Sequence, residues 1–383
     1  ENGHLLVYTG VMEKEENGLK KTYQNQCVAI GDGTDYRKAD NNPVITGDMM
    51  PTGFSREDFR DPKIWREEDV YYLLAGNKTD EGIPQVVLFH SDNLEDWQYV
   101  SVLAKDLDGK LGTMWECPDF FSLNGEYGLL ISPQNMMAGN EFHNGNNVAF
   151  LSGKYDKKRH IFQYDKAISV DEGLDFYAPQ TLEMPDGRRI MIGWMQSWDS
   201  NIRPENQKWS GMMSLPRELQ IIDGKLIQSP VKEMENYYAD TVNYTNQEIA
   251  GECQLSRIGG RTVDMTIEIL SGEFREFCIQ FAANEKYRTF ITYDKIKNTL
   301  EFDRTYSGMV RDTISSRRVA IKAPKESLKL RFVLDKYSAE IFVNDGEQVL
   351  SSTFYTPMDA EEIHFGCDGV AVTNIEKHAI AVD

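Results

Sequence analysis

Short runs of alternating apolar and polar residues follow one another along most of the chain, separated by turn residues. In residues 246–383 such runs include TVDMTIEIL, EFCIQFAAN, RTFITYD and TLEFDR. Strands this short and this regularly spaced predict an antiparallel β-sandwich. Within it, Asp345-Gly346 predicts a hairpin turn.

The first 228 residues also have a β pattern, and it repeats. Three segments, RDPKIWREEDVYYLLAG, ECPDFFSLNGEYGLLIS and YAPQTLEMPDGRRIMIGW, each place a proline before a short strand, a polar turn and a strongly apolar strand. The prolines Pro62, Pro118 and Pro179 are 56 and 61 residues apart. A repeat of this length, with four strands per unit, predicts the blades of a β-propeller. An ordinary β-meander is the alternative that this pattern leaves open.

The chain begins ENGHLLVYTG, where Asn2-Gly3 is typical of a hairpin turn. Residues 5–8 are the predicted strand after that turn, and no segment before it supplies the other arm. We interpret residues 1–50 as the later strands of a blade that lacks its innermost strand.

A change in composition marks a domain boundary near residue 230. All six tryptophans lie in the first 209 residues, and eleven of the thirteen prolines lie at or before Pro230. Ser229 and Pro230 are typical of the N-cap and first position of a helix, so SPVKEMENYY predicts a short connecting helix. We predict a propeller over residues 1–228, a linker with this helix over 229–245 and a β-sandwich over 246–383.

Composition and charge limit the classes of ligand. Of 383 residues, 40% are apolar and 11% aromatic, enough for a large core. The chain has 41 Lys and Arg against 61 Asp and Glu, a net charge of −20, which should repel nucleic acid and favour neutral ligands. Five cysteines without metal-binding spacing favour free thiols, and no apolar run is long enough to cross a bilayer. Nucleic acid and membrane are therefore not expected as partners.

The repeat places reactive side chains at one position in successive blades. If Pro62 and Pro118 are equivalent, Arg60 aligns with Glu116 and Asp61 with Cys117. Innermost strands begin at the central channel of a propeller, so we expect these charged groups to converge. Two carboxylates on neighbouring strands meet the needs of glycoside hydrolysis, a proton donor and a second carboxylate.

Glu116 and Asp61 differ in their predicted surroundings. Glu116 lies in MWECPDFF, an apolar setting that suits a carboxylic acid kept protonated. Asp61 follows Arg60, whose guanidinium would keep the carboxylate ionised. Each also has a structural interpretation, a surface glutamate and an Asp-Pro turn with an ion pair. Trp198 is a candidate for stacking on a sugar ring, and Asp119 is assigned to a surface or turn role.

These motifs resemble glycoside hydrolase family 32, which comprises invertases, sucrose-6-phosphate hydrolases and fructanases. FRDPKIW, WECPDFF, DEGLDFYAPQT, GWMQSW and WSGMMSLPREL look like family motifs in the family's order, and the similarity extends over essentially the whole chain. The resemblance implies an all-β fold, a five-bladed propeller followed by a β-sandwich. It also implies retaining hydrolysis of terminal β-fructofuranosides such as sucrose or sucrose 6-phosphate.

The resemblance also assigns roles to individual residues. Glu116 would be the general acid/base, and Asp61 the transition-state stabiliser that binds fructose hydroxyls, with Arg60 beside it in the same role. Cys117 would tune the surroundings of Glu116, and Trp198 would line the sugar site. Neither a metal nor an organic cofactor is implied.

One departure from the family concerns the nucleophile. Family members carry an Asn-Asp-Pro-Asn-Gly motif near the amino terminus, whose aspartate is the nucleophile, and then a Phe-Ser-Gly-Ser strand. Neither motif occurs here, and residues 8–10 resemble the segment that follows them. Asp32 and Asp35 belong to a predicted turn and stand in no such motif. We expect that the first blade is absent and that the chain alone is inactive, because it has no nucleophile.

Substrate choice is left open. The motifs look closest to those of bacterial sucrose and sucrose-6-phosphate hydrolases, which favours a cytoplasmic location. Phosphate recognition would need basic side chains, and Arg188, Arg203, Lys208 and His143 are present without an assigned role. The alternatives are a non-catalytic carbohydrate-binding protein and a propeller glycosidase that acts on arabinose or xylose. The oligomeric state is not predicted.

Overall fold

The computed structural model describes residues 3–139, 141–200, 202, 207–308, 313–321 and 327–381. Strands make up nearly all of the regular structure in these residues, with three short 3-10 helices. None of the helices in this part of the chain is long and apolar enough to cross a membrane. Packing divides the chain into two compact units, residues 1–169 with 178–180 and residues 170–177 with 181–383.

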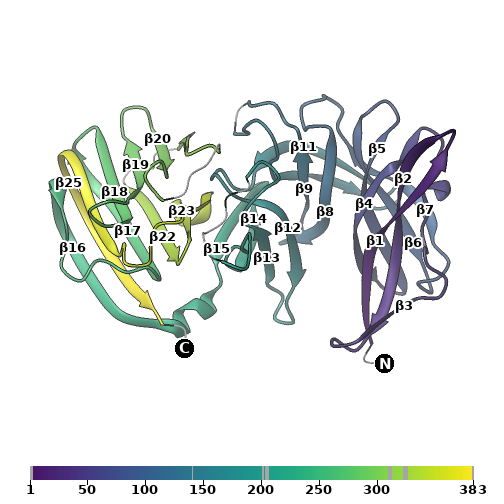
Figure 1. Ribbon diagram of the computed structural model, residues 1–383, viewed down its shortest axis with the longest axis horizontal. Coiled ribbons are helices and arrows are strands. Elements are labelled where there is room, and N and C mark those ends of the chain that lie inside the picture. Colours follow the sequence, from purple (N-terminus) through teal and green to yellow (C-terminus); the bar gives the residue numbers. More distant parts are fainter. Residues whose placement is uncertain are drawn as a thin grey trace. The chain divides into compact units, whose positions relative to one another are not determined.

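The first unit contains three antiparallel sheets, one after another in the chain (Figure 1). The first sheet consists of β1 (His4–Glu16), β2 (Leu19–Gly31) and β3 (Tyr36–Lys38), and the 3-10 helix η1 (Gly47–Met49) follows it. The second consists of β4 (Phe54–Glu67), β5 (Val70–Thr79), β6 (Pro84–Ser91) and β7 (Gln98–Lys105). The third consists of β8 (Met114–Leu123), β9 (Glu126–Gln134), β10 (Ala149–Asp156) and β11 (Ile161–Ser169). Each strand pairs with the next, as in propeller blades.

Apolar side chains cover both faces of the second sheet. Neighbouring residues of a strand point to opposite faces, so Leu73 and Leu74 enter different cores. Leu73 packs in the cluster that contains Val28 and Phe59, whereas Leu74 packs in the cluster that contains Trp115. Burial on both faces explains the continuous apolar run in β5.

The first hairpin turns at a different Asn-Gly pair from the one that the sequence pattern suggested. Asn17 and Gly18, with φ of 53° and 75°, join β1 to β2, and the strand pairing starts at Glu16↔Leu19. Residues 5–8 lie in β1 as predicted, and their hairpin partner follows them in the chain. Asn2 lies outside the described residues.

The second unit contains a four-stranded sheet and a β-sandwich. The four-stranded sheet consists of β12 (Tyr177–Glu183), of which residues 178–180 belong to the first unit, β13 (Arg189–Trp194), β14 (Arg217–Ile222) and β15 (Lys225–Pro230). The 3-10 helix η2 (Lys232–Tyr237) leads into the sandwich. The sandwich strands are β16 (Tyr238–Cys253), β17 (Val263–Glu273), β18 (Glu276–Ala283), β19 (Thr289–Asp294), β20 (Thr299–Asp303), β21 (Ser316–Ala320), β22 (Leu328–Asp335), β23 (Ser338–Val343), β24 (Gln348–Thr353) and β25 (Glu362–Ile380), with η3 (Asn344–Gly346) between β23 and β24.

The long strand β25 connects the two layers of the sandwich (Figure 1). In β25, residues 370–379 pair with β17 and residues 362–367 pair with β18. β16 pairs along most of the length of β25. The core between the layers includes Ile267, Phe281, Phe302, Phe332 and Ile375. The predicted fold class, all-β with propeller-like sheets followed by a β-sandwich, is confirmed.

The connecting helix differs from its prediction in type and start. η2 is a 3-10 helix that begins at Lys232, with Val231 at its N-cap and no side-chain cap bond. Ser229 and Pro230 end β15, because strand pairing with β14 uses the backbone of this segment. The predicted turn at Asp345-Gly346 is present as part of η3. The domain boundaries at 228 and 245 stay predictions.

A buried ionic cluster lies inside the second unit. Arg217 of β14 is fully buried, and its guanidinium donates to Glu340 Oε2 at 2.6 Å and to Asp171 Oδ2 at 3.0 Å. It also donates to Ser351 and Gln228 at 2.6 and 2.9 Å. Burial alone would lower the pKa of Arg217, but the two carboxylates raise it above the usual value. The cluster therefore fastens residues 170–177 to β14 and to the sandwich.

Arg217→Met should destabilise the second unit strongly. The carboxylates of Asp171 and Glu340 would stay buried without a counter-charge, so we expect a loss of about 3–5 kcal/mol, measured by denaturant unfolding. Arg318→Met is the control, because Arg318 pairs with Glu301 at the surface with 52% of its side chain exposed. Such exposed pairs contribute at most about 1 kcal/mol. Equal losses in the two variants would contradict the role of the cluster.

Candidate active site

The residues directly before the three repeat prolines share an unusual backbone conformation. Asp61, Cys117 and Ala178 have φ of 61°, 48° and 52°. This left-handed region is rare for residues with a side chain, and residues before proline are usually extended. Such torsions persist only where the surrounding structure holds them.

Each of the first two positions is a β-bulge. In β4 the pairing with β5 skips from Arg60 to Lys63, and in β8 the pairing with β9 skips from Glu116 to Asp119. One extra residue in β4 and in β8 disrupts the ladder and bends the strand. Arg60 and Glu116 therefore occupy the same place in their sheets, as the alignment of the repeats predicted.

Hydrogen bonds connect the first strands of successive sheets at these bulges. The Asp61 N–H donates to Thr9 Oγ1 at 3.0 Å, and the Cys117 N–H donates to Asp61 Oδ2 at 3.0 Å. The side-chain amide of Gln180 donates to the carbonyl oxygen of Cys117 at 3.1 Å. A neighbouring strand thus fixes each bulge and offsets the cost of the left-handed backbone.

Arg60 and Glu116 form a largely buried ion pair. Arg60 Nε donates to Glu116 Oε1 at 2.9 Å, and the two side chains are 15% and 12% exposed. The same guanidinium contacts Asp58 at 3.1 Å and the side-chain oxygens of Gln24 and Gln134 at 3.3 and 3.4 Å. Burial would lower the pKa of Arg60, but Glu116 and Asp58 raise it above the usual value. The guanidinium stays charged and holds the carboxylate of Glu116 in one orientation.

The charge of Arg60 lowers the pKa of Asp61, as predicted, but no hydrogen bond joins these two side chains among the described residues. The guanidinium hydrogen-bonds Glu116, because consecutive side chains diverge along a strand and Asp61 turns toward Cys117 at the bulge. Burial raises the pKa of Asp61, and the charge of Glu116 raises it further. The Cys117 N–H and the charge of Arg60 lower it by less.

Cys117 lies next to both carboxylates. Burial raises the pKa of its thiol well above the usual value, and the charges of Asp61 and Glu116 add to this effect. The neutral thiol lies 3.7 Å from Asp61 Oδ2 as a weak hydrogen-bond donor. Cys117 therefore offers an S–H group and not a nucleophilic thiolate.

Asp119 is buried, which corrects the surface or turn role predicted for it. Its side chain is 1% exposed and accepts a hydrogen bond from Lys63 Nζ at 3.0 Å. Lys63 also donates to Gln180 Oε1 at 3.1 Å. Lys63, Asp119 and Gln180 directly follow the three repeat prolines, so the repeat itself was a signal that they would meet.

Four further polar residues around this site were missed in the sequence, namely Thr9, Gln24, Asp58 and Gln134. Asp58 had a local signal, because it stands two residues before Arg60 and so on the same side of β4. The other three lie in different strands from Arg60, in β1, β2 and β9. No local pattern indicates their convergence.

The remaining sequence candidates lie apart from this cluster in the chain. Trp198 belongs to the second unit, where its ring is 69% exposed and stands edge-on to Trp194 with centroids 5.5 Å apart. Arg188, a basic residue considered for phosphate recognition, is ion-paired with the carboxylates of Asp186, Glu218 and Glu233. His143 Nδ1 lies 2.8 Å from the carbonyl oxygen of the next residue, and Arg203 lies outside the described residues. Within the described part of the chain, no group of three or more His, Cys, Asp or Glu is placed to hold a metal ion.

Two family models match the chain. The model described as "Glycosyl hydrolases family 32 N-terminal domain" matches residues 1–230, and "Glycosyl hydrolases family 32 C terminal" matches residues 233–381. A sucrose-6-phosphate hydrolase of Escherichia coli is 33% identical over 380 residues. The match covers 97% of this chain and 76% of that protein.

Solved structures with the same fold include two enzymes. A GH32 β-fructofuranosidase of Bombyx mori matches with a TM-score of 0.83 and 27% identity, over 99% of this chain and 77% of that one. A sucrose-6-phosphate hydrolase from Lactobacillus gasseri matches with a TM-score of 0.84 and 22% identity, over 99% and 76%. The second likeness supports the fold alone.

Asp61→Asn should remove the cost of burying a carboxylate at this site. Because the folded-state pKa of Asp61 is raised, the parent loses stability relative to the variant as pH rises from the ordinary value of 3.8 through the raised value. We expect the difference in Tm, variant minus parent, to increase across this window. Thermal unfolding between about pH 3 and pH 8 measures it.

Asp32→Asn is the control with the opposite sign. The backbone N–H groups of Asp35 and Thr34 lower the pKa of Asp32, so the parent gains stability relative to this variant as pH rises through the ordinary value. A Tm difference for Asp61→Asn that also falls with rising pH would contradict the raised pKa of Asp61.

Proposed function

The chain belongs to glycosyl hydrolase family 32 and is a glycoside hydrolase of the β-fructofuranosidase type, and from that premise we propose that Glu116 and Asp61 act in retaining hydrolysis of terminal β-fructofuranosides. One observation carries the proposal. On adjacent first strands, the Arg60–Glu116 ion pair lies beside an aspartate held by the Cys117 N–H. Such an arrangement brings a proton donor and a second carboxylate to one place.

Glu116 serves as the acid/base in this proposal. It donates a proton to the glycosidic oxygen of the leaving group and, in the second step, accepts a proton from the attacking water. Both steps need the carboxyl group at a fixed position. The 2.9 Å hydrogen bond from Arg60 supplies that constraint.

Asp61 stabilises the fructosyl unit. Its Oδ2 accepts the Cys117 N–H, whereas Oδ1 accepts no hydrogen bond from any described residue and is open to a sugar hydroxyl. Positive charge that develops on the sugar in the transition state strengthens such a bond. Arg60 shares this role, and Cys117 positions Asp61.

We further propose that residues 1–383 alone do not complete the reaction. Retention requires a carboxylate nucleophile, and the family's Asn-Asp-Pro-Asn-Gly motif does not occur in this sequence. Asp32 is no substitute, because its Oδ1 accepts the backbone N–H groups of Thr34 and Asp35 within a turn. The same missing motif favours the second candidate function, carbohydrate binding without catalysis.

Sucrose and sucrose 6-phosphate are the two substrates under consideration. The name of the Escherichia coli relative, a sucrose-6-phosphate hydrolase, favours the phosphorylated sugar. Recognition of its phosphate would need a basic side chain on the leaving-group side, and none is assigned. A cytoplasmic location follows from the likeness to bacterial enzymes and stays a proposal.

The purified 383-residue chain should not release glucose from sucrose, or glucose 6-phosphate from sucrose 6-phosphate, above the uncatalysed rate. It lacks the carboxylate that would form the fructosyl-enzyme. A coupled enzymatic assay measures either product. The matched comparison is a chimera in which an amino-terminal segment that carries the family's Asn-Asp-Pro-Asn-Gly motif precedes residue 1, and this protein should be active. Turnover by the chain alone would refute the proposal that it lacks a nucleophile.

Glu116→Gln in the active chimera should lower kcat about 10²- to 10⁴-fold, the contribution of a positioned acid/base. Asp61→Asn should lower it at least about 10²-fold, as removal of a transition-state stabiliser does. Glu95→Gln is the control, because Glu95 is exposed in a turn of the first unit. A near-normal rate in either site variant would overturn the role given to that residue.

A further inference from the structure

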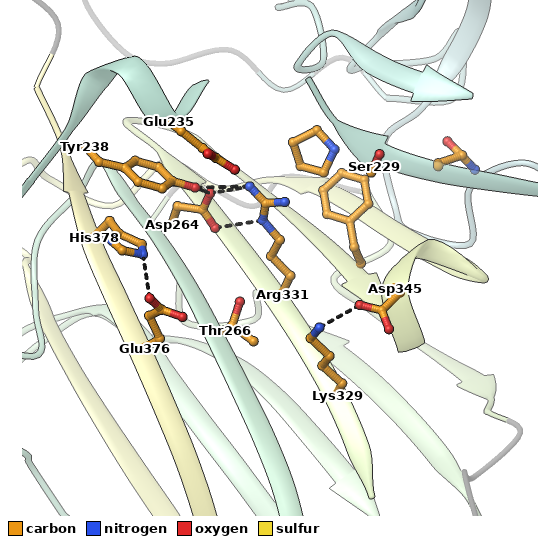
Figure 2. A pocket seen from close by; sticks show the side chains of 13 residues that line it. Ser229, Glu235, Tyr238, Asp264, Thr266, Lys329, Arg331, Asp345, Glu376 and His378 are labelled. Carbon is orange, nitrogen blue, oxygen red and sulfur yellow. Dashed lines mark hydrogen bonds and ion pairs between the residues drawn. The ribbon is translucent and has the colours of Figure 1, made fainter. Parts of the chain in front are cut away.

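A pocket of about 470 Å³, lined mainly by polar and charged residues, lies in the second unit over the outer face of β17, β22 and β25 (Figure 2). The side chains of β17 alternate between the two faces of the sheet. Val263, Met265 and Ile267 enter the sandwich core, whereas Asp264 and Thr266 line the pocket. Residues of β15, of η2 and of the start of β16 also line it.

A connected group of side chains forms the floor of the pocket. Arg331 donates from Nε and Nη2 to the two oxygens of Asp264 at 3.0 and 2.7 Å, and the Tyr238 hydroxyl donates to the same carboxylate (Figure 2). Asp264 is only 2% exposed. The ring of Tyr238 stacks on His378 with centroids 4.1 Å and planes 4° apart. These contacts hold the aromatic and guanidinium planes in place.

The charge of the pocket argues against an anionic ligand. Four of its lining side chains are carboxylates, and two, Lys329 and Arg331, are permanent cations. Lys329 is paired with Asp345 at 2.7 Å, and His378 lies 3.3 Å from Glu376. A phosphate group would therefore meet excess negative charge, whereas a neutral ligand would not.

Four polar groups at the pocket keep unused hydrogen-bonding capacity. Within the described residues, no hydrogen bond is made by Arg331 Nη1, by the carboxylate of Glu235 or by the hydroxyls of Thr266 and Ser229. They comprise a donor, an acceptor and two groups that can do either. Neighbouring hydroxyls of a sugar present the same mixture of donors and acceptors.

The pocket continues along the sheet into a second cavity of about 450 Å³. Thr266, Lys329 and Glu376 line both cavities, and the second adds the side chains of Asn243 and Asn374. Each cavity is within the range of about 300–1,000 Å³ that is typical of ligand pockets. Together they form a polar groove on the outer face of the sandwich, which we call the sandwich groove.

We propose that the sandwich groove binds neutral saccharides, as a second carbohydrate site built from other residues than Glu116 and Asp61. The ion pairs and the ring stack hold the guanidinium of Arg331 and the ring of Tyr238 in place. The four polar groups without a hydrogen-bond partner among the described residues can bond to sugar hydroxyls. The choice of fructosides as the first probes rests on the proposed function. The chemistry of the groove itself specifies only a neutral polyhydroxyl ligand.

Calorimetric titration of the 383-residue chain with sucrose, 1-kestose and maltotriose tests the proposal. In the double variant Glu235→Gln/Thr266→Val, two unused groups are removed while every charge pair on the floor remains. We expect the bound saccharide to lose at least about tenfold in affinity, which corresponds to about 1.4 kcal/mol. The matched control is Glu285→Gln/Thr299→Val, which changes the same residue types outside both cavities. Unchanged Tm values would show that both proteins fold.

Asp61→Asn separates the sandwich groove from the candidate active site. Binding that is weakened in the groove variant and retained in Asp61→Asn supports the proposal, whether or not any protein hydrolyses sucrose. Binding that is lost in Asp61→Asn and unchanged in the groove variant overturns it and leaves the proposed function standing. Absence of saccharide binding, equal weakening in the control variant, or a preference for inorganic phosphate would also overturn it.

Discussion

The hydrogen bond from the Cys117 N–H to the Asp61 carboxylate joins two sheets where both first strands carry a β-bulge. In an unbroken ladder, Arg60 and Asp61 would point to opposite faces of the sheet. At the bulge, Arg60 contacts Glu116 while Asp61 contacts Cys117, so two consecutive residues of β4 meet two consecutive residues of β8. The charge arrangement of the candidate active site depends on this local break in strand pairing.

The two units use buried guanidinium groups differently. Arg217 is fully buried and meets carboxylates at 2.6 and 3.0 Å, so its hydrogen-bonding capacity is used within the fold. Arg60 keeps 15% of its side chain exposed, and its bonds to Gln24 and Gln134 are longer, at 3.3 and 3.4 Å. A guanidinium whose hydrogen bonds are all made within the protein fixes the packing around it. A guanidinium with longer hydrogen bonds and some exposure can still bind groups of a ligand. The burial of Asp61 raises the pKa of its carboxyl, so the ionised form costs stability, a cost of the kind that active sites commonly carry.

The spacing of the three repeat prolines predicted the sheets of the first unit and the residues that align in them, because a repeated pattern records repeated structure. The same pattern aligned Arg60 with Glu116, but it did not show the burial of Asp119 or the contact of Asp61 with Cys117, because both depend on the torsions at the bulges. Local sequence signals also gave wrong positions for a hairpin turn and for the start of a helix, because strand pairing determines both positions. Asn2-Gly3 and Asn17-Gly18 have the same turn preference, and Ser229 could cap a helix only if it were not part of β15. Sequence thus predicts element types better than it predicts which polar groups meet.

Ala178 adopts the same left-handed torsion as Asp61 and Cys117, although its methyl group has no chemical role to play. The left-handed torsion is therefore a property of the repeated backbone, whatever side chain the residue carries. A repeated sheet that keeps this torsion keeps a preformed position, and a single substitution there alters the reactive group without rebuilding the strand. In such a lineage the chemistry of the site can diverge while the architecture stays constant.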